Sequence, residues 1–279
     1  LGKNRYTDDT QMAIGIGELL LSSSPLTREH IAGSLLTAYR RDPRPGYSAL
    51  TRAMLEESPD AASFLVSLSP DEISARKSDG AAMRALPIGL LPDRGDVIRI
   101  AARSAAITHG HPDAIAATVG VALIAHDRYY SAAPFPIIIR SLPATIPCLS
   151  RDARQYLEAV IGKGYHPGTI LGQYATTGVP YTESLILLAA VMAVLVAYGT
   201  SPRKVLTRSV RLGGDTDTTA CIALAASLIW PDESWIPAAL ITELENGPYG
   251  RDFLLSLGDR LGRKFPVRRA GETMPPSSG

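Results

Sequence analysis

Two short acidic clusters near opposite ends of the chain carry the residue types best suited to chemistry. The first is TDDT at residues 7–10, and the second is DTDT at residues 215–218, directly after the glycine pair at 213 and 214. Aspartate and threonine are favoured at helix N-termini because their side chains accept hydrogen bonds from free backbone N–H groups. One N-cap needs only one such side chain, so capping explains only part of the second cluster.

Carboxylates this close together repel one another unless a cation lies among them or one of them is protonated. If both clusters begin helices that meet in the fold, their side chains form a site for divalent cations. Hard oxygen ligands from aspartate and threonine, with no cysteine or histidine in either cluster, favour Mg²⁺ or Mn²⁺ over Zn²⁺.

Each cluster also has a simpler interpretation. Gln11 stands three residues after Asp8, which is the pattern of a capping box, so the first cluster read alone predicts a helix cap. Asp215 and Asp217 form a D-x-D triplet, which some glycosyltransferases use to hold a metal and a nucleotide. Such triplets usually end a strand of an α/β fold, and the helical periodicity around them here argues against that alternative.

The elements that must position these clusters are helices, because apolar residues recur at spacings of three and four through most of the chain. We expect a single all-α domain over residues 1–262, with small side chains that let helices pack closely. The tail at 263–279 is basic and rich in proline and serine, and it is predicted to be flexible. The predicted helical segments are 9–21, 28–40, 46–57, 97–107, 112–126, 151–161, 182–198, 203–211, 216–229 and 234–245.

Composition excludes several classes of partner. The 279 residues are 46% apolar and carry a formal net charge of +1, so a large core is available and neither nucleic acid nor an anionic membrane is expected as a partner. The longest apolar run, residues 185–198, is too short to span a bilayer and predicts a buried helix. The only cysteines are Cys148 and Cys221, with no disulfide-like spacing, so we expect reduced thiols and a cytoplasmic location.

Two further stretches contain polar candidates. Ser78 begins the small-residue stretch SDGAA, which precedes Met83 and Arg84; a small-residue turn before a helix lets backbone N–H groups approach a phosphate, although such a turn is also common in ordinary loops. His109 and His111 form a His-x-His pair, but no third zinc ligand stands nearby, so a loop before the helix that Pro112 starts is the ordinary interpretation.

Four motifs in order, YTDDTQM, SDGAAMRALPIGLL, THGHPDAIAA and LGGDTDT, together resemble the signatures of the ADP-ribosylglycohydrolase family, from residue 6 to about residue 244. The resemblance implies a compact multi-helix domain with two divalent ions, Mg²⁺ or Mn²⁺, between helix ends. By this similarity the metal ligands are Thr7, Asp8, Asp9, Asp215, Asp217 and Thr218. The residues implied to bind substrate are Ser78, Asp79, Gly80, Ala81 and Ala82 for the diphosphate and ribose, and His111 and Asp113 at the edge of the pocket.

The reaction implied by the resemblance is hydrolysis of the bond between the distal ribose of ADP-ribose and an acceptor, which releases ADP-ribose. Carboxylates stabilise the oxocarbenium-like centre that forms as the acceptor leaves, and a metal-bound water attacks it. Asp8 or Asp9 is the expected base. The partner is then an ADP-ribosylated protein, such as one modified on arginine, or a small ADP-ribosylated molecule, and a monomer is favoured.

Two alternatives stay open at this point. The first alternative to an ADP-ribosyl hydrolase is a hydrolase of another nucleotide-like glycoside, and the second is a non-catalytic relative that binds ADP-ribose and metal. Family members usually begin with a helix bearing G-D-A-x-G and, in several branches, a glutamate near the metals. We expect that helix to be absent from this sequence, which starts at Leu1. Tyr174 and Tyr181, in the Gly-, Thr- and Tyr-rich stretch 164–185, are candidates for stacking on adenine.

Overall fold

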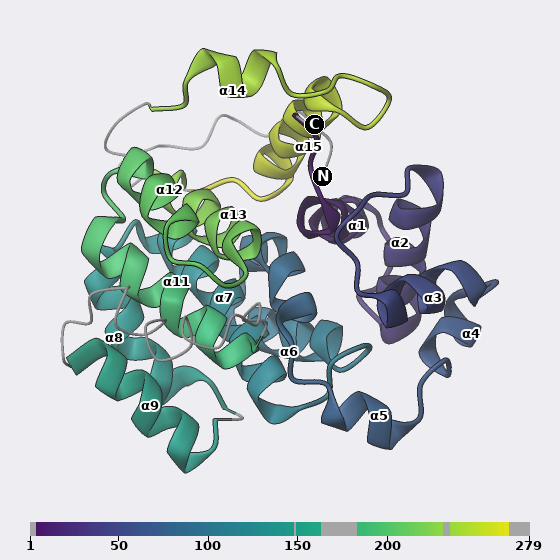
Figure 1. Cartoon of the computed structure of the whole chain (residues 1–279), viewed down its shortest axis with the longest axis horizontal. Helices are drawn as coiled ribbons and strands as arrows, with labels where there is room; N and C mark the ends of the chain where they lie inside the picture. The colour runs from purple at the N-terminus through teal and green to yellow at the C-terminus, as the bar shows by residue number, and fades with distance from the viewer. Residues whose placement is uncertain (1–3, 148, 163–182, 231–234, 268–279) are drawn as a thin grey trace, which may run out of the picture.

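A computed structural model describes residues 4–147, 149–162, 183–230 and 235–267. Within these residues the structure is helical with no named strand, and a lone antiparallel bridge joins Ser78 to Glu183. The prediction of an all-α fold is confirmed (Figure 1). The α-helices are α1 (Asp8–Leu21), α2 (Arg28–Arg41), α3 (Ala49–Glu57), α4 (Ala61–Leu65), α5 (Pro70–Ala75), α6 (Arg94–Ala105), α7 (Pro112–Ser131), α8 (Phe135–Thr145), α9 (Arg151–Gly162), α11 (Ser184–Tyr198), α12 (Pro202–Val210), α13 (Thr216–Ser227), α14 (Ala238–Thr242) and α15 (Arg251–Lys264). Two short 3₁₀ helices, η1 (Asp79–Arg84) and η2 (Leu86–Leu90), connect α5 to α6.

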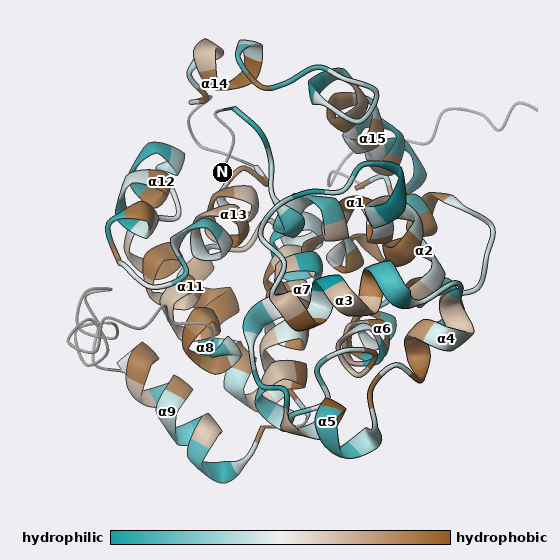
Figure 2. Cartoon of the chain, turned by 45° about the vertical axis from the view of Figure 1, so that its right-hand side comes forward, coloured by the Kyte–Doolittle hydropathy of each residue, from teal (hydrophilic) through white to brown (hydrophobic). Residues whose placement is uncertain are grey.

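The centre of the molecule is formed by α7 and α11, which are apolar on almost every side. Small residues let neighbouring elements approach them closely: a Cβ added at Gly120 of α7 would lie 2.8 Å from Leu188 of α11, and one at Gly89 of η2 would lie 2.7 Å from the Ala122 carbonyl. Figure 2 shows hydrophobic residues concentrated in α8 and α11, with mixed faces on outer helices such as α9. The apolar run at 185–198 is therefore a buried helix, as predicted.

The start of α1 differs from the predicted capping box. Thr7 is the N-cap residue, and its side chain makes no capping bond. The Gln11 amide donates instead to the Ala38 carbonyl over 3.1 Å, while its oxygen accepts from the Tyr47 hydroxyl at 2.8 Å. Gln11 thus ties α1 to the end of α2 and to the following loop, a long-range role that local sequence cannot indicate.

The start of α13 explains the glycine pair. Gly213 and Gly214 both have positive φ, at 79° and 73°, in the left-handed region that favours glycine. They turn the chain so that Asp215 becomes the N-cap residue, and its carboxylate accepts from the Thr218 N–H at 3.2 Å. One aspartate of this cluster therefore caps the helix, and the other polar residues are not needed for that purpose.

Several elements were not foreseen. The helices α4, α5, α8 and α15 have no counterpart among the predicted segments, and α15 includes Arg263 and Lys264, which were assigned to the tail. Phe265 then packs into the core and its carbonyl accepts from the Tyr129 hydroxyl at 2.8 Å, so the packed domain runs past residue 262. Residues 163–182, with Tyr174 and Tyr181, residues 268–279 and Cys148 lie outside the described residues. No helix in the described part of the chain is both long enough and apolar enough to cross a membrane.

Candidate functional site

Both aspartate clusters line one cavity of about 360 Å³, although they come from opposite ends of the chain. The start of α1, the start of α13, η1 and the segment from the α2–α3 loop into α3 form its walls. This convergence is the arrangement that the sequence pattern predicted. The lining residues are Asp8, Asp9, Met12, Gly46, Tyr47, Ser48, Thr51, Arg76, Ser78, Asp79, Gly80, Met83, Arg84, Thr108, His109, Gly214, Asp215, Asp217 and Thr218.

Asp8 lies against the backbone of Gly46. A Cβ at Gly46 would lie 1.7 Å from Asp8 Oδ1, and the φ of Gly46 is +117°, so this position requires glycine on both grounds. Burial, followed by the negative charge of Asp9, raises the pKa of Asp8 to about 7. The charges of Asp217 and Asp215 act in the same direction, which places the second cluster within electrostatic reach of the first.

Asp9 is the most enclosed of the predicted ligands, with 3% of its surface exposed. Burial raises its pKa, and hydrogen bonding from Thr218 and from Thr7 opposes that rise. The Thr7 hydroxyl donates to Asp9 Oδ2 over 3.0 Å. Thr7 itself faces a neighbouring cavity, which Asp9 and Asp217 also line. In this structure Thr7 therefore contributes to the site through its hydrogen bond to Asp9, and not by lining the first cavity.

Asp79 joins the acidic clusters. It was predicted to bind substrate with its neighbours, but its carboxyl group faces Asp215, and burial together with the Asp215 charge raises the pKa of Asp79 to about 9. The pKa of Asp215 is raised to about 6 by burial and by its contact with Asp217. Asp217 stands exposed at the rim. The sequence places Asp79 far from both clusters, so only the folded structure identifies this fifth carboxyl group.

His109, and not His111, is the histidine of the cavity. It is 2% exposed, its Nε2 lies 2.9 Å from Ser78 Oγ, and its Nδ1 lies 2.8 Å from Thr108 Oγ1. A Cβ at Gly80 would lie 3.0 Å from its ring, so the small residue of η1 makes room for the imidazole. Burial, then the charge of Arg76, holds the pKa of His109 well below its usual value, and the ring is neutral at pH 7. His109 and His111 are separated by one residue in the same loop, and nothing in the sequence indicates which of the two side chains faces the cavity.

The structure does not bring the remaining predicted contacts to this cavity. His111 is the N-cap residue of α7, where its Nδ1 accepts from the Asp113 N–H at 3.1 Å, and Asp113 lines a separate hollow beside α9. Ala81 and Ala82 are fully buried in the core. Of the stretch 78–82, Ser78, Asp79 and Gly80 line the cavity.

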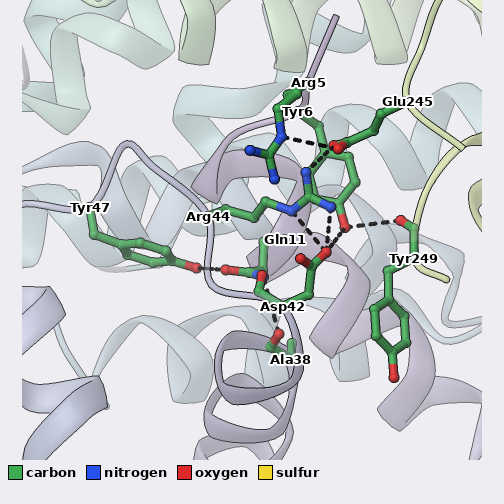
Figure 3. Close-up of polar contacts among 9 residues, drawn as sticks. All are labelled: Arg5, Tyr6, Gln11, Ala38, Asp42, Arg44, Tyr47, Glu245 and Tyr249. Carbon is green, nitrogen blue, oxygen red and sulfur yellow. Dashed lines mark hydrogen bonds and ion pairs between the residues drawn. The ribbon is translucent and has the colours of Figure 1, made fainter. Parts of the chain in front are cut away.

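A charged network behind α1 holds the loop that carries Gly46. Figure 3 shows Arg44 between Asp42 and Glu245, with which it forms ion pairs. The Arg44 guanidinium also lies over the Tyr6 ring, 3.9 Å from its centroid. The Tyr6 hydroxyl donates to the Tyr249 carbonyl over 3.0 Å. The Arg44 side chain is only 4% exposed, so its charge depends on these two carboxylates. The network joins the start of α1 and the α2–α3 loop to the segment before α15.

The donor set fits a hard divalent cation. Oδ1 of Asp9 and Oδ2 of Asp79 are buried without a hydrogen-bond partner among the described residues, and burial raises the pKa of both carboxyl groups. A bound cation would offset this cost of burial. Among the described residues, however, no three aspartate, glutamate, histidine or cysteine side chains are already grouped as a metal site. The carboxylates share one cavity but remain spread around its walls.

The described structure is an all-α protein whose helices bring several carboxyl groups to one cavity. Carboxyl groups are the catalytic groups of most glycoside hydrolases. The sequence matches the ADP-ribosylglycohydrolase family over residues 2–271, and the chain belongs to that family. Among solved structures, the chain is similar to one described as "ADP-ribosylglycohydrolase-related protein complex", with a TM-score of 0.60 and 23% identity over 94% of this chain and 83% of that one. That likeness bears on the fold alone. No curated protein matched the sequence.

Proposed function

We propose that this protein is a metal-dependent glycohydrolase that cleaves the bond between the distal ribose of ADP-ribose and an acceptor, releasing ADP-ribose. Family membership supports glycohydrolase chemistry in general. The observation that carries the specific proposal is the single cavity that receives both aspartate clusters together with Asp79. A site with this many carboxyl groups suits a reaction that develops positive charge at an anomeric carbon.

Asp8 and Asp9 are the proposed catalytic carboxylates. Their negative charge would stabilise the oxocarbenium-like centre, and one of them would take the proton of the attacking water. Burial raises the pKa of Asp8 to about 7 in the absence of metal, and a bound cation would lower it, so that Asp8 would be ionised at neutral pH and able to accept a proton. His109 is neutral, and both of its ring nitrogens are bonded to hydroxyls, so it is suited to hold Ser78 in place at the wall of the cavity.

Asp8, Asp9, Asp215, Asp217 and Thr218 are the residues that would hold Mg²⁺ or Mn²⁺, and Thr7 would support Asp9. When bound, such cations offset the repulsion among the carboxylates and orient the ribose and a water molecule. The acceptor is proposed to be an arginine-type side chain or a small molecule.

Incubation with ADP-ribosyl-arginine, with and without a chelator, tests the proposal. We expect release of free ADP-ribose that stops with chelator and returns on addition of Mg²⁺ or Mn²⁺. The Asp8→Asn and Asp9→Asn variants should lose at least about 100-fold in turnover, whereas Asp259→Asn, at an exposed pair on α15, should retain it. Full turnover by both cavity variants would remove their catalytic role.

A further inference from the structure

Arg76 is a cation of the cavity, and no acid in the described part of the chain neutralises it. It follows α5, and its side chain reaches the cavity beside Thr51 and His109. Nη2 donates to Thr51 Oγ1 over 2.9 Å and lies 3.4 Å from His109 Nε2, while Nη1 lies 3.9 Å from the sulfur of Met54. Every one of these contacts is neutral.

Among the described residues, no carboxylate oxygen lies within 4.0 Å of the Arg76 guanidinium. Its Nε is buried without a hydrogen-bond partner. Burial lowers the pKa of Arg76, which is the effect of a desolvated cation without a compensating anion.

Arg84 also lines the cavity, and it too forms no ion pair with a residue that the structure describes. It donates to the Gly80 and Ser104 carbonyls and to the hydroxyls of Ser104 and Thr108, so neutral acceptors occupy its guanidinium. Arg84 is therefore explained as a structural brace between η1 and α6. Arg76 has donor capacity left over, and it faces the cavity.

A partly buried cation without an anion beside it is energetically unfavourable. An anionic ligand that binds next to such a cation supplies the missing negative charge, and this makes binding more favourable. A guanidinium also presents paired donors that match phosphate oxygens. Phosphate brought close to the aspartates would be repelled, whereas Arg76, on the same cavity, has no described carboxylate oxygen within 4.0 Å of its guanidinium. The cavity is thus acidic around Asp8, Asp9 and Asp79 and cationic at Arg76.

We propose that Arg76 is the residue that binds the phosphate group of the substrate and so restricts the site to phosphate-bearing glycosides. This inference deepens the proposed function and rests on it for the identity of the sugar. A phosphate-free nucleoside would reach the carboxylates but lack the contact with Arg76.

Titration of metal-free protein with inorganic pyrophosphate tests the anion site separately from hydrolysis. We expect Arg76→Gln to weaken pyrophosphate binding about 10- to 100-fold, and Arg76→Lys to weaken it less because the charge remains. Arg52→Gln, at an exposed position of α3, is the matched control and should bind like the wild type. Adenosine, which lacks phosphate, should bind the wild type and Arg76→Gln equally.

The melting temperature separates a binding role from a structural one. Because no acid within the described ranges pairs with the charge of Arg76, Arg76→Gln should melt at or above the wild-type temperature. Equal pyrophosphate binding by Arg76→Gln and wild type, or no binding by the wild type, would overturn the proposal for Arg76. If Arg76→Gln loses pyrophosphate binding while the wild type cleaves no ADP-ribosyl substrate, the anion site stands and the proposed reaction fails. If the wild type cleaves ADP-ribosyl-arginine and Arg76→Gln has an unchanged KM, the reaction stands and the role of Arg76 fails.

Discussion

The backbone of Gly46 lies so close to the carboxylate of Asp8 that a Cβ there would approach Oδ1 to 1.7 Å. Gly46 belongs to the loop between α2 and α3, and Arg44 anchors this loop to Asp42 and Glu245. The position of a predicted catalytic aspartate is therefore set by a glycine nearly forty residues further along the chain. This relationship links the charged network behind α1 to the chemistry of the cavity.

Substituting Gly46 by alanine should disturb both stability and the site. The new methyl group meets the Asp8 carboxylate, and the positive φ strains any residue with a Cβ, so we expect Gly46→Ala to lower the free energy of unfolding by about 1–3 kcal/mol. Thermal unfolding and turnover of ADP-ribosyl-arginine measure the two effects. Gly258→Ala, on α15 with open space around it, is the control and should stabilise by about 0.5–1 kcal/mol. A Gly46→Ala protein as stable and active as the wild type would contradict the close contact.

The stability of the metal-free protein should fall as pH rises from 7 to 9. In the unfolded chain aspartates ionise near pH 3.8, whereas folding raises the pKa of Asp8 to about 7 and that of Asp79 to about 9. The folded state then binds more protons than the unfolded state, so its stability is greatest at low pH and is lost as pH rises through these folded values. The effect should be about 1 kcal/mol per pH unit near Asp79.

Thermal unfolding with chelator over this pH range measures the loss, and Asp79→Asn should flatten it. His109 acts in the opposite direction, because its pKa is lowered, but only below about pH 6.5. Added Mg²⁺ should restore more stability at pH 9 than at pH 7, since cations compete with protons for the same oxygens. A stability that rises with pH in the metal-free protein would show that these carboxylates are not held protonated by the fold.

The two histidines of the loop before α7 should respond differently to substitution. His109→Ala removes a cavity residue bonded to Ser78 and should raise the KM for ADP-ribosyl-arginine by about 10-fold or more. His111→Ala removes a helix cap and should cost about 1 kcal/mol of stability while KM stays within about two-fold. Steady-state kinetics and thermal unfolding separate the two. The reverse pattern would restore the assignment of His111 as the substrate contact.

The helical fold could be predicted from the sequence because it follows from local patterns, whereas the convergence of both aspartate clusters was expected from their matching acidic motifs and from the family resemblance. Period-3.6 hydrophobicity marks most helices, and the glycine pair before Asp215 marks a sharp turn into α13. The sequence predicted Asp79 only as a substrate contact, and it predicted no role at the cavity for His109 or Arg76. Each depends on which side chains meet across the cavity, and that is decided by packing between η1, α3 and the loop before α7. The short helices α4 and α5 lack the long periodic runs by which helices are recognised. In α8 the buried residues Phe135, Ile138 and Leu142 do recur at helical spacing, but prolines at its start and at Pro143 are typical of a helix end.

Mn²⁺ binding to variants of each cluster tests the central claim most directly. Calorimetric titration at pH 8 would compare the wild type with Asp9→Asn from α1 and Asp217→Asn from α13, and Asp259→Asn would serve as the control. If the two helix ends form one centre, the wild type should bind two ions, and either cavity variant should lose at least about 10-fold in affinity for both. If one variant leaves Mn²⁺ binding unchanged, or if each removes one ion and leaves the other at wild-type affinity, the two clusters do not share a metal centre.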